Sequence, residues 1–202
     1  MTYTPEQISQ IVLKVLKEVE EPDVSRLSNA EKIELAENPN TSQELLSILA
    51  TDDDWRVRYY VAENPNTSQE LLGILATDKH SYVRWEVAKN PNTSQELLKI
   101  LATDKHSYVR CGVARNQNTS QELLKILATD KSSIVRYGVA RNKNTPQELL
   151  AILATDEDSY VRSASENNPN YKKQTLELTS VQYNALKKLI ESGQDKVLKG
   201  IL

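Results

Sequence analysis

The apolar and polar positions of this chain recur in one fixed order with a period of 26 residues. The most constant block reads Asn-Pro-Asn-Thr-Ser-Gln-Glu-Leu-Leu-Gly-Ile-Leu-Ala-Thr-Asp at residues 64–78. Similar copies occupy residues 38–52, 90–104, 116–130 and 142–156. Between the copies lies a looser block whose constant pair is Val-Arg, as at Val57 and Arg58. A fixed period of this size predicts a solenoid, in which each repeat buries its apolar face only against its neighbours.

The constant block predicts a short helix over residues 42–50. Thr41 is the expected N-cap residue, and Glu44 at the third position completes a capping box with it. In the fifth copy Pro146 replaces the serine that follows this threonine, and proline is favoured at the first helical position. The apolar residues expected to be buried are Leu45, Leu46, Ile48 and Leu49. An apolar arc this wide predicts that neighbouring repeats flank the helix on both sides.

The looser block predicts a second helix over residues 55–63, with Val57, Val61 and Ala62 facing inward. The Asn-Pro-Asn turn should end this helix, because proline disfavours helical backbone at the residue before it. Helices of about nine residues are too short to be stable alone in water, so stacking must hold them. The predicted fold is therefore an all-α solenoid of five 26-residue repeats with helical caps at both ends.

Residues 1–35 hold an N-terminal helix and a half repeat. The helix does not follow the repeat and is expected to cap the array, because the outer end of a solenoid needs a polar face. Thr4, Pro5 and Gln7 predict the start of a helix. Thr4 is the expected N-cap residue and forms a capping box with Gln7, and Pro5 fits the first helical position. Apolar residues at helical spacing then predict a helix that ends near Glu21. A second capping box, Ser-Asn-Ala-Glu at residues 28–31, leads into a half repeat.

The repeats extend over residues 36–170, and residues 171–202 change character again. A capping box at residues 179–182 precedes an amphipathic helix over residues 180–192 that stops at Gly193. This helix is expected to cap the array. The alternative is a detachable helix that docks on a partner or on another copy of the chain.

Over about residues 36–170 the pattern Asn-Pro-Asn-Thr-Ser-Gln-Glu-Leu-Leu-x-x-Leu-Ala-x-Asp-x-x-x-x-Val-Arg-x-x-Val-Ala resembles the leucine-rich repeat variant (LRV) repeat. The resemblance implies alternating α- and 3₁₀-helices in a right-handed superhelix similar to HEAT repeats. Whether the second helix of each repeat is α or 3₁₀ stays open. Some members of the family carry an N-terminal iron–sulphur domain held by several cysteines. Because the single Cys111 lies outside that region, no such cofactor is expected, and the family implies no common enzymatic activity.

Composition narrows the class of protein further. The 202 residues carry a net charge of -3, so no whole-chain bias points to nucleic acid or membrane. One cysteine excludes an internal disulfide framework and suits a reducing compartment. No apolar run approaches the ~18 residues of a membrane span, and no signal peptide pattern begins the chain. We therefore expect a cytoplasmic protein.

Two recurring sets of side chains could be mistaken for sites of chemistry. Each repeat carries an acid–base pair, as at Asp52 and Arg58, which we interpret as a ladder of salt bridges because catalysis needs one unusual site. His80 and His106 occupy equivalent positions in adjacent repeats. Stacked helices lie ~8–10 Å apart, whereas histidine–zinc bonds are about 2 Å. We expect exposed or capping histidines, no metal site, no catalytic residue and no cofactor.

The variable positions of the second helix are more informative. If Val57 and Val61 face inward, positions 56, 59 and 63 lie on the opposite face, where later repeats place aromatic and basic residues. Such residues are typical of interfaces. The predicted partner-binding residues are Tyr59, Tyr82, Trp85, Lys89, Tyr108, Arg115, Tyr137 and Arg141. The alternative is that Tyr82, Tyr108 and Tyr160 only stack on one another as a packing ladder.

Charge changes sign along the array. Residues 36–61 sum to -3 (two basic, five acidic) and residues 62–87 to -2 (two basic, four acidic). Residues 88–113 and 114–139 each sum to +2 (four basic, two acidic), and residues 140–165 return to -1 (three basic, four acidic). This layout would orient a charged partner.

These observations predict a non-enzymatic scaffold or adaptor that binds a protein or an acidic peptide across the second-helix face. The alternative is a HEAT-like nucleic-acid-binding protein that uses the basic middle repeats, which a steep fall of affinity with salt would reveal. An enzyme would instead need one carboxylate with a strongly shifted pKa at the centre of this face.

Overall fold

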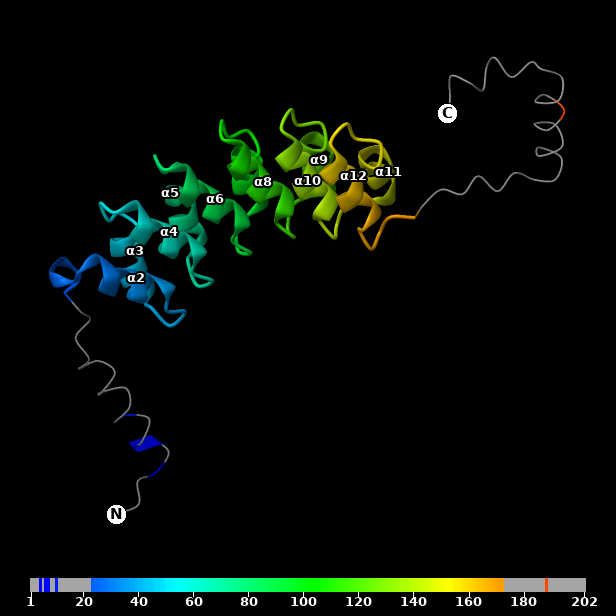
Figure 1. The fold of residues 1–202 in the computed structure, drawn as a ribbon. Coiled ribbons are helices and arrows are strands. Elements are labelled where there is room, and N and C mark those ends of the chain that lie inside the picture. Colours follow the sequence, from blue (N-terminus) through cyan, green and yellow to red (C-terminus); the bar gives the residue numbers. More distant parts are fainter. Residues whose placement is uncertain (1–3, 5, 8–9, 11–22, 173–187, 189–202) are drawn as a thin grey trace. The chain divides into compact units, whose positions relative to one another are not determined.

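The helices of the described chain alternate between two lengths with the period of the sequence (Figure 1). The computed structural model describes residues 4, 6–7, 10, 23–172 and 188. A 3₁₀-helix, η1, spans Val24–Arg26, and no strand occurs in these residues. The first helices of the repeats are α3 (Gln43–Leu49), α5 (Gln69–Leu75), α7 (Gln95–Leu101), α9 (Gln121–Leu127) and α11 (Gln147–Leu153). The second helices are α2 (Asn29–Glu37), α4 (Trp55–Glu63), α6 (Ser81–Lys89), α8 (Ser107–Arg115), α10 (Ser133–Arg141) and α12 (Ser159–Glu166).

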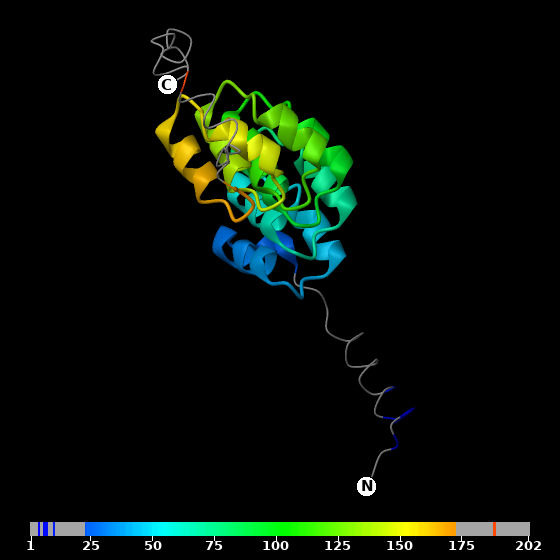
Figure 2. The same ribbon diagram turned by 90° about the vertical axis from the view of Figure 1, so that its right-hand side faces the viewer.

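The second helices pack directly against one another in chain order, from α2 to α12 (Figures 1 and 2). No comparable packing joins the first helices α3 to α11 to one another. Each of them packs instead on the second helices that precede and follow it. The second helices therefore form a closely packed layer, and the first helices form a more open layer beside it. All of these helices belong to one unit, Met1–Tyr171, and Lys172–Leu202 forms another.

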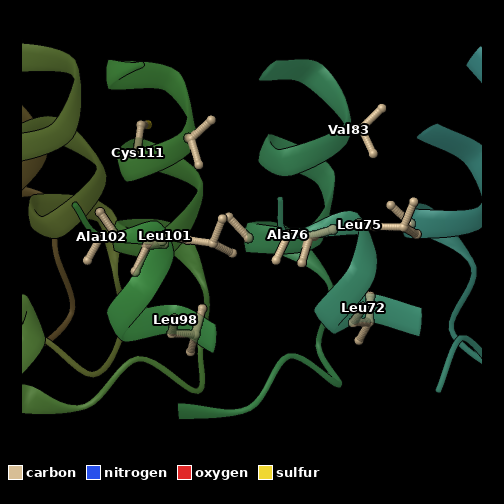
Figure 3. Packing of buried hydrophobic residues seen from close by; sticks show 14 of the residues in the cluster. Leu72, Leu75, Ala76, Val83, Leu98, Leu101, Ala102 and Cys111 are labelled. Carbon is tan, nitrogen blue, oxygen red and sulfur yellow. The ribbon is translucent and has the colours of Figure 1, made fainter. Parts of the chain in front are cut away.

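Leucines of the first helices and valines of the second helices form the core. Leu72, Leu75 and Val83 are buried from solvent, and Leu98 and Leu101 hold the same places in the next repeat (Figure 3). Burying a leucine side chain completely stabilises a fold by about 1.5–3 kcal/mol. Because every repeat supplies the same set, the core runs the length of the described array.

The prediction that Ile48 is buried is wrong. Ile48 and its equivalents are more than half exposed. The exposed fractions are 51% for Ile48, 51% for Ile74, 57% for Ile100, 65% for Ile126 and 65% for Ile152. Because the first helices do not pack closely on one another, the outer edge of their apolar arc has no neighbour to cover it.

The N-cap of each first helix lies one residue later than predicted. Ser42, not Thr41, caps α3, and its hydroxyl accepts a hydrogen bond from the Leu45 amide at 3.2 Å. Thr41 instead donates its hydroxyl to the carbonyl of Leu35 at 2.6 Å, near the end of α2, where helical carbonyls lack partners. Pro146 likewise holds the extended N-cap position of α11 (φ -70°, ψ 156°) and not the first helical position.

The second helices match their predicted limits. Helix α4 begins at Trp55 and ends at Glu63, and Val57, Val61 and Ala62 are fully buried in it. All of the second helices are α-helical, which answers the question that the sequence left open.

The asparagine that ends each second helix joins its repeat to the one before. The Asn64 side-chain amide donates to the carbonyls of Ala36 at 2.7 Å and Asn38 at 2.9 Å, and its Oδ1 accepts from the Asn66 amide at 2.8 Å. The buried group thereby satisfies three of its hydrogen-bonding sites. The same arrangement recurs at Asn90, Asn116, Asn142 and Asn168.

The recurring acid–base pairs form a ladder of ion pairs between repeats, which confirms their structural interpretation. In four of the repeats the arginine Nε lies close to Oδ2 of the aspartate in the next repeat. The pairs are Arg58–Asp78, Arg84–Asp104 and Arg110–Asp130 at 2.6 Å and Arg136–Asp156 at 2.7 Å. Lys32 takes the place of arginine at the start and lies 2.7 Å from Asp52.

Two glycines lie where neighbouring second helices approach each other closely. A Cβ on Gly112 would lie 2.9 Å from the Cβ of Ala88 and 3.1 Å from the backbone oxygen of Trp85. A Cβ on Gly138 would lie 2.9 Å from the Cβ of Ala114. Only a residue without a side chain fits at these two positions, which are in the middle of the array.

The ends of the chain are described in part. The Thr4 amide donates to Oε1 of Gln7 at 3.0 Å and the Gln7 amide to the Thr4 hydroxyl at 3.2 Å, as the predicted capping box requires. The capping box of Ser28 and Glu31 is also present, at the start of α2. The rest of the N-terminal helix predicted to end near residue 21 lies outside the described residues, apart from residue 10. The helix predicted over residues 180–192 also lies outside them, apart from residue 188.

Candidate partner-binding face

The predicted stripe lies on the outer face of the second-helix layer, and several of its aromatic rings are exposed. The exposed fractions of Tyr82, Tyr108 and Tyr160 are 56%, 53% and 76%. Tyr82 contacts rings of its own and the preceding repeat, whereas Tyr108 pairs with His106 at 5.7 Å. No ring contact joins Tyr82 to Tyr108 in the described chain, so the packing ladder of tyrosines is wrong.

The first two complete repeats bring their aromatic rings together across α4 and α6. The Trp55 ring stacks on His80 at 4.0 Å with an interplanar angle of 9°, and on Tyr82 at 5.8 Å and 25°. Tyr82 also meets Trp85 edge to face at 6.5 Å. These rings border a shallow pocket of about 400 Å³, called the aromatic pocket below. It is lined by Trp55, Arg56, Tyr59, Tyr60, Tyr82 and Trp85.

A buried carboxylate lies beside this pocket. Glu86 is almost fully buried and lies 2.9 Å from the Lys89 ammonium, which is 4.2 Å from the centroid of the Trp85 ring. Burial, together with a hydrogen bond to Glu86, raises the pKa of Tyr59. Burial and the nearby charge of Glu86 raise the pKa of Glu63. Among the described carboxylates with a displaced pKa, Glu63 alone has a raised one, and its neighbours account for it.

The basic part of the stripe lies further along the array. Arg115 of α8 and Arg141 of α10 are exposed, and their guanidinium carbons lie 5.6 Å and 5.8 Å from the centroid of the Tyr137 ring. Arg141 also donates to the Tyr137 hydroxyl at 3.2 Å. A second pocket of about 380 Å³ adjoins Arg141, and Lys143 and Tyr160 line it as well.

The histidines do not cap helices. His80 and His106 hold the N-cap positions of α6 and α8, but neither side chain forms a capping hydrogen bond. His106 is exposed as predicted, whereas His80 is half-buried against Trp55. Cys111 is buried, and burial raises the pKa of its thiol. No group of three His, Cys, Asp or Glu side chains in the described chain is placed to hold a metal ion.

The structure thus divides the predicted residues into two groups. Tyr59, Tyr82, Trp85 and Lys89 gather at the aromatic pocket. Arg115, Tyr137 and Arg141 gather two repeats later, and Tyr108 lies outside both groups.

Sequence reasoning missed four residues of the first group: Trp55, Tyr60, His80 and Glu86. The run Trp-Arg-Val-Arg-Tyr-Tyr at residues 55–60 was the available signal, because no other repeat concentrates aromatic residues in this way. Glu86 could also have been noticed in the sequence, because it is charged where the other repeats have the uncharged residues Tyr60, Gly112, Gly138 and Ala164.

No helix in the described part of the chain has the length and apolar character that a membrane span requires. No curated protein matches the sequence. Among solved structures, the crystal structure of an engineered protein is 19% identical, with 77% of this chain and 94% of that chain covered and a TM-score of 0.41. A structure described as a leucine-rich repeat variant with a novel repetitive protein structural motif is 22% identical, with 90% of this chain and 82% of that chain covered and a TM-score of 0.35.

The family model described as leucine rich repeat variant matches residues 55–80, which is one complete period. The matched period begins with helix α4 and includes the Asn-Pro-Asn turn and helix α5. The same order of second helix, turn and first helix recurs through the described array with the period of the sequence. The described array is therefore an all-α helical solenoid, and one of its periods is similar to the leucine rich repeat variant.

Proposed function

We propose that this chain is a non-enzymatic scaffold or adaptor that binds a partner protein through its second-helix face. The observation that carries the proposal is the exposure of Tyr82 and Tyr108 on the same layer as the cations Arg115 and Arg141. Tyrosine and arginine are enriched among the residues that dominate binding energy at protein interfaces. A cytoplasmic location fits the single cysteine, which is free and buried.

The proposed partner presents an acidic segment to the middle repeats. Neither Arg115 nor Arg141 forms an ion pair with a carboxylate of the described residues, although the four arginines of the ladder all do. Residues 88–139, which hold two of the repeats, have a positive sum of charges. Positive charge at an interface steers an acidic partner and increases its association rate.

The test compares two variants. One reverses two positive charges on the second-helix face, and the other reverses two positive charges on the first helices. The face variant Arg115→Glu/Arg141→Glu alters two exposed residues of the second helices. Its matched control, Lys99→Glu/Lys125→Glu, alters two exposed residues of the first helices α7 and α9 and has the same net charge. Each chain is immobilised and exposed to nuclease-treated native lysate, and the retained proteins are quantified at low and high salt.

We expect a protein that the wild type and the control retain and that the face variant loses. Equal retention by all three chains would remove the assignment to this face. Equal loss in both variants would show that net charge alone accounts for the retention. If the untreated lysate yields nucleic acid that disappears with salt, the nucleic-acid alternative replaces the scaffold, because counterion release makes such binding strongly salt-dependent.

A further inference from the structure

A pocket also lies at the equivalent place between α10 and α12, but only two of the five residues that line it, Tyr137 and Tyr160, are aromatic. The aromatic pocket between α4 and α6 differs from it in the number of its rings. Five of its six lining residues are aromatic, and both tryptophans of the chain are among them. The position of Trp55 is Ser81, Ser107, Ser133 and Ser159 in the other repeats, so no other second helix begins with an aromatic ring. A concentration of rings that the equivalent pocket lacks is not needed for the stacking that all repeats share.

The rings of this pocket already attract cations of the chain. The Lys89 ammonium lies 4.2 Å from the centroid of the Trp85 ring, and the Arg56 guanidinium carbon lies 5.5 Å from that of Trp55. Both distances are within the ~6 Å at which the face of an aromatic ring stabilises a positive charge. Each of these cations also has a carboxylate neighbour, Glu86 for Lys89 and Asp54 for Arg56.

Negative charge remains after these two pairs are formed. Glu63 forms no ion pair with any described residue. Burial and the charge of Glu86 raise its pKa, and the more weakly acting charge of Lys89 lowers it. Burial and the negative charges of Glu86 and Glu63 raise the pKa of the Tyr59 hydroxyl, and Tyr59 lines the pocket. The repeats that form the pocket are also the acidic ones, with -3 over residues 36–61 and -2 over residues 62–87. The surroundings therefore favour one more positive charge at the rings.

We propose that the aromatic pocket binds an alkylated ammonium group, namely the side chain of a methylated lysine in the partner protein. Aromatic faces suit such a group because it combines positive charge with apolar methyl groups. A bare lysine ammonium is strongly hydrated and loses more water on entry. The proposal rests on the proposed function, since the same second-helix face carries the pocket. The proposed partner therefore has two features. A methylated lysine binds the aromatic pocket in the acidic repeats, and an acidic segment contacts Arg115 and Arg141.

The two tryptophans make the pocket directly measurable in the full chain. Tryptophan fluorescence, or the indole N–H signals in NMR, is followed while tetramethylammonium, N-acetyl-trimethyllysine amide or N-acetyl-lysine amide is added at constant ionic strength. The control compound is tert-butyl alcohol, which is neutral and similar in shape to tetramethylammonium. It tests whether the positive charge contributes to binding. We expect saturable binding of the two quaternary compounds and binding about tenfold weaker for the neutral compound and for unmethylated lysine.

Two tyrosine variants locate the binding. Tyr82→Ala removes a pocket ring that is 56% exposed, so the core is left intact. Tyr108→Ala removes the ring at the equivalent place one repeat later, which is 53% exposed and outside the pocket. We expect Tyr82→Ala to weaken binding by at least about fivefold and Tyr108→Ala to leave it unchanged. Glu63→Gln should weaken the binding of the charged ligands and leave that of the neutral compound as it was.

Three results would overturn the binding of an alkylated ammonium group at this pocket. They are no saturable signal from either quaternary compound, equal affinity for the neutral compound, and equal loss in both tyrosine variants. If free tetramethylammonium binds as tightly as the trimethyllysine amide, the pocket recognises the ammonium group and not a lysine side chain, and the partner assignment fails. These titrations do not involve Arg115 or Arg141, so their failure is distinguishable from a failure of the lysate experiment.

Discussion

Arg84 holds Asp104 of the next repeat with two charge-assisted hydrogen bonds, from Nε to Oδ2 at 2.6 Å and from Nη2 to Oδ1 at 3.0 Å. Its Nη1 donates at 2.7 Å to the backbone oxygen of Asp78 in its own repeat. The two side chains are only 9% and 10% exposed. One guanidinium therefore joins two repeats, and its planar fork explains why arginine and not lysine recurs at this position.

Removal of the guanidinium should destabilise the array strongly. In Arg84→Met the carboxylate of Asp104 stays buried without its partner, and the free energy of unfolding should fall by about 3–5 kcal/mol. In the double variant Arg84→Met/Asp104→Leu no unpaired charge is left, so much of that loss should be recovered. Urea unfolding followed by circular dichroism measures both values.

The end of the array offers the control. Arg162 is the last of the recurring arginines, and its described hydrogen bonds go to the backbone oxygens of Asp156 and Glu157 and not to a carboxylate. Arg162→Met should therefore cost less than half as much as Arg84→Met. Equal costs would mean that the bonds to backbone oxygens, and not the ion pair, connect the repeats.

The ladder also makes stability depend on pH. Burial alone would raise the pKa of Asp104, but hydrogen bonds from Arg84 and the His106 amide outweigh it and lower the pKa. At Asp156 the hydrogen bond from Arg136 is the largest cause of the lowered pKa. A carboxyl whose pKa is lower in the folded state stabilises the fold above its unfolded pKa of about 3.9, and this stabilisation is lost as pH falls towards the folded value.

The thermal midpoint should consequently change little between neutral pH and about pH 5 and should fall steeply below about pH 4. Differential scanning calorimetry in buffers of constant ionic strength measures this. The variant Arg84→Met/Asp104→Leu lacks one of these ion pairs, so its thermal midpoint should fall less than that of the wild type between about pH 5 and about pH 3. A wild-type midpoint that stays constant down to about pH 3 would contradict the linkage.

The periodic part of the fold was predictable because periodic sequence imposes equivalent environments. The prolines after Asn38 and Asn64 mark the ends of the second helices, and the limits predicted for α4 agree with the structure. The exposure of Ile48 was not predictable, because helical periodicity gives the width of an apolar arc but not the spacing between neighbouring helices. Thr41 and Ser42 are both good N-cap residues, so the sequence alone did not distinguish them.

The candidate site was predictable only as a face. The pattern placed Tyr82 and Trp85 on the outer side of α6, as the structure does. The contact of Trp55 with His80 joins two repeats and depends on how far one helix is rotated against the next. A period in the sequence contains no information about that rotation, and the aromatic pocket was missed for this reason.

Two glycines provide a matched test of the close approach between second helices. Gly112→Ala places a methyl group 2.9 Å from the Cβ of Ala88 and 3.1 Å from the backbone oxygen of Trp85, so the helices must separate. Overpacking of this kind should lower the free energy of unfolding by about 1–3 kcal/mol. Gly73 lies in helix α5 with open space around it, so Gly73→Ala should stabilise the chain by about 0.4–1 kcal/mol. Chemical denaturation of both variants checks the opposite signs, and the same sign for both would contradict the packing argument.

The asparagine ladder should be as important as the ion pairs. The amide of Asn90 donates to the carbonyls of Ala62 at 2.7 Å and Asn64 at 3.1 Å, and its Oδ1 accepts from the Asn92 amide at 2.8 Å. Asn90→Ala removes the partner of the Ala62 carbonyl and of the Asn92 amide, whereas the Asn64 carbonyl keeps a hydrogen bond from the Thr67 amide at 3.1 Å. Each unsatisfied group costs about 1–3 kcal/mol, so a loss of at least about 2 kcal/mol is expected in urea unfolding.

Asn92 is the matched control for this prediction, because it also bonds across the repeats, to the carbonyl of Pro65, but from an exposed position. Water can replace the Asn92 side chain in Asn92→Ala, so that variant should lose about 1 kcal/mol or less. Asn90→Asp adds a further check. It substitutes an acceptor for the donor that faces two carbonyl oxygens, and should therefore destabilise the chain at least as much as Asn90→Ala at neutral pH. If Asn90→Asp were as stable as the wild type, the side-chain amide would not be what joins the turns of successive repeats.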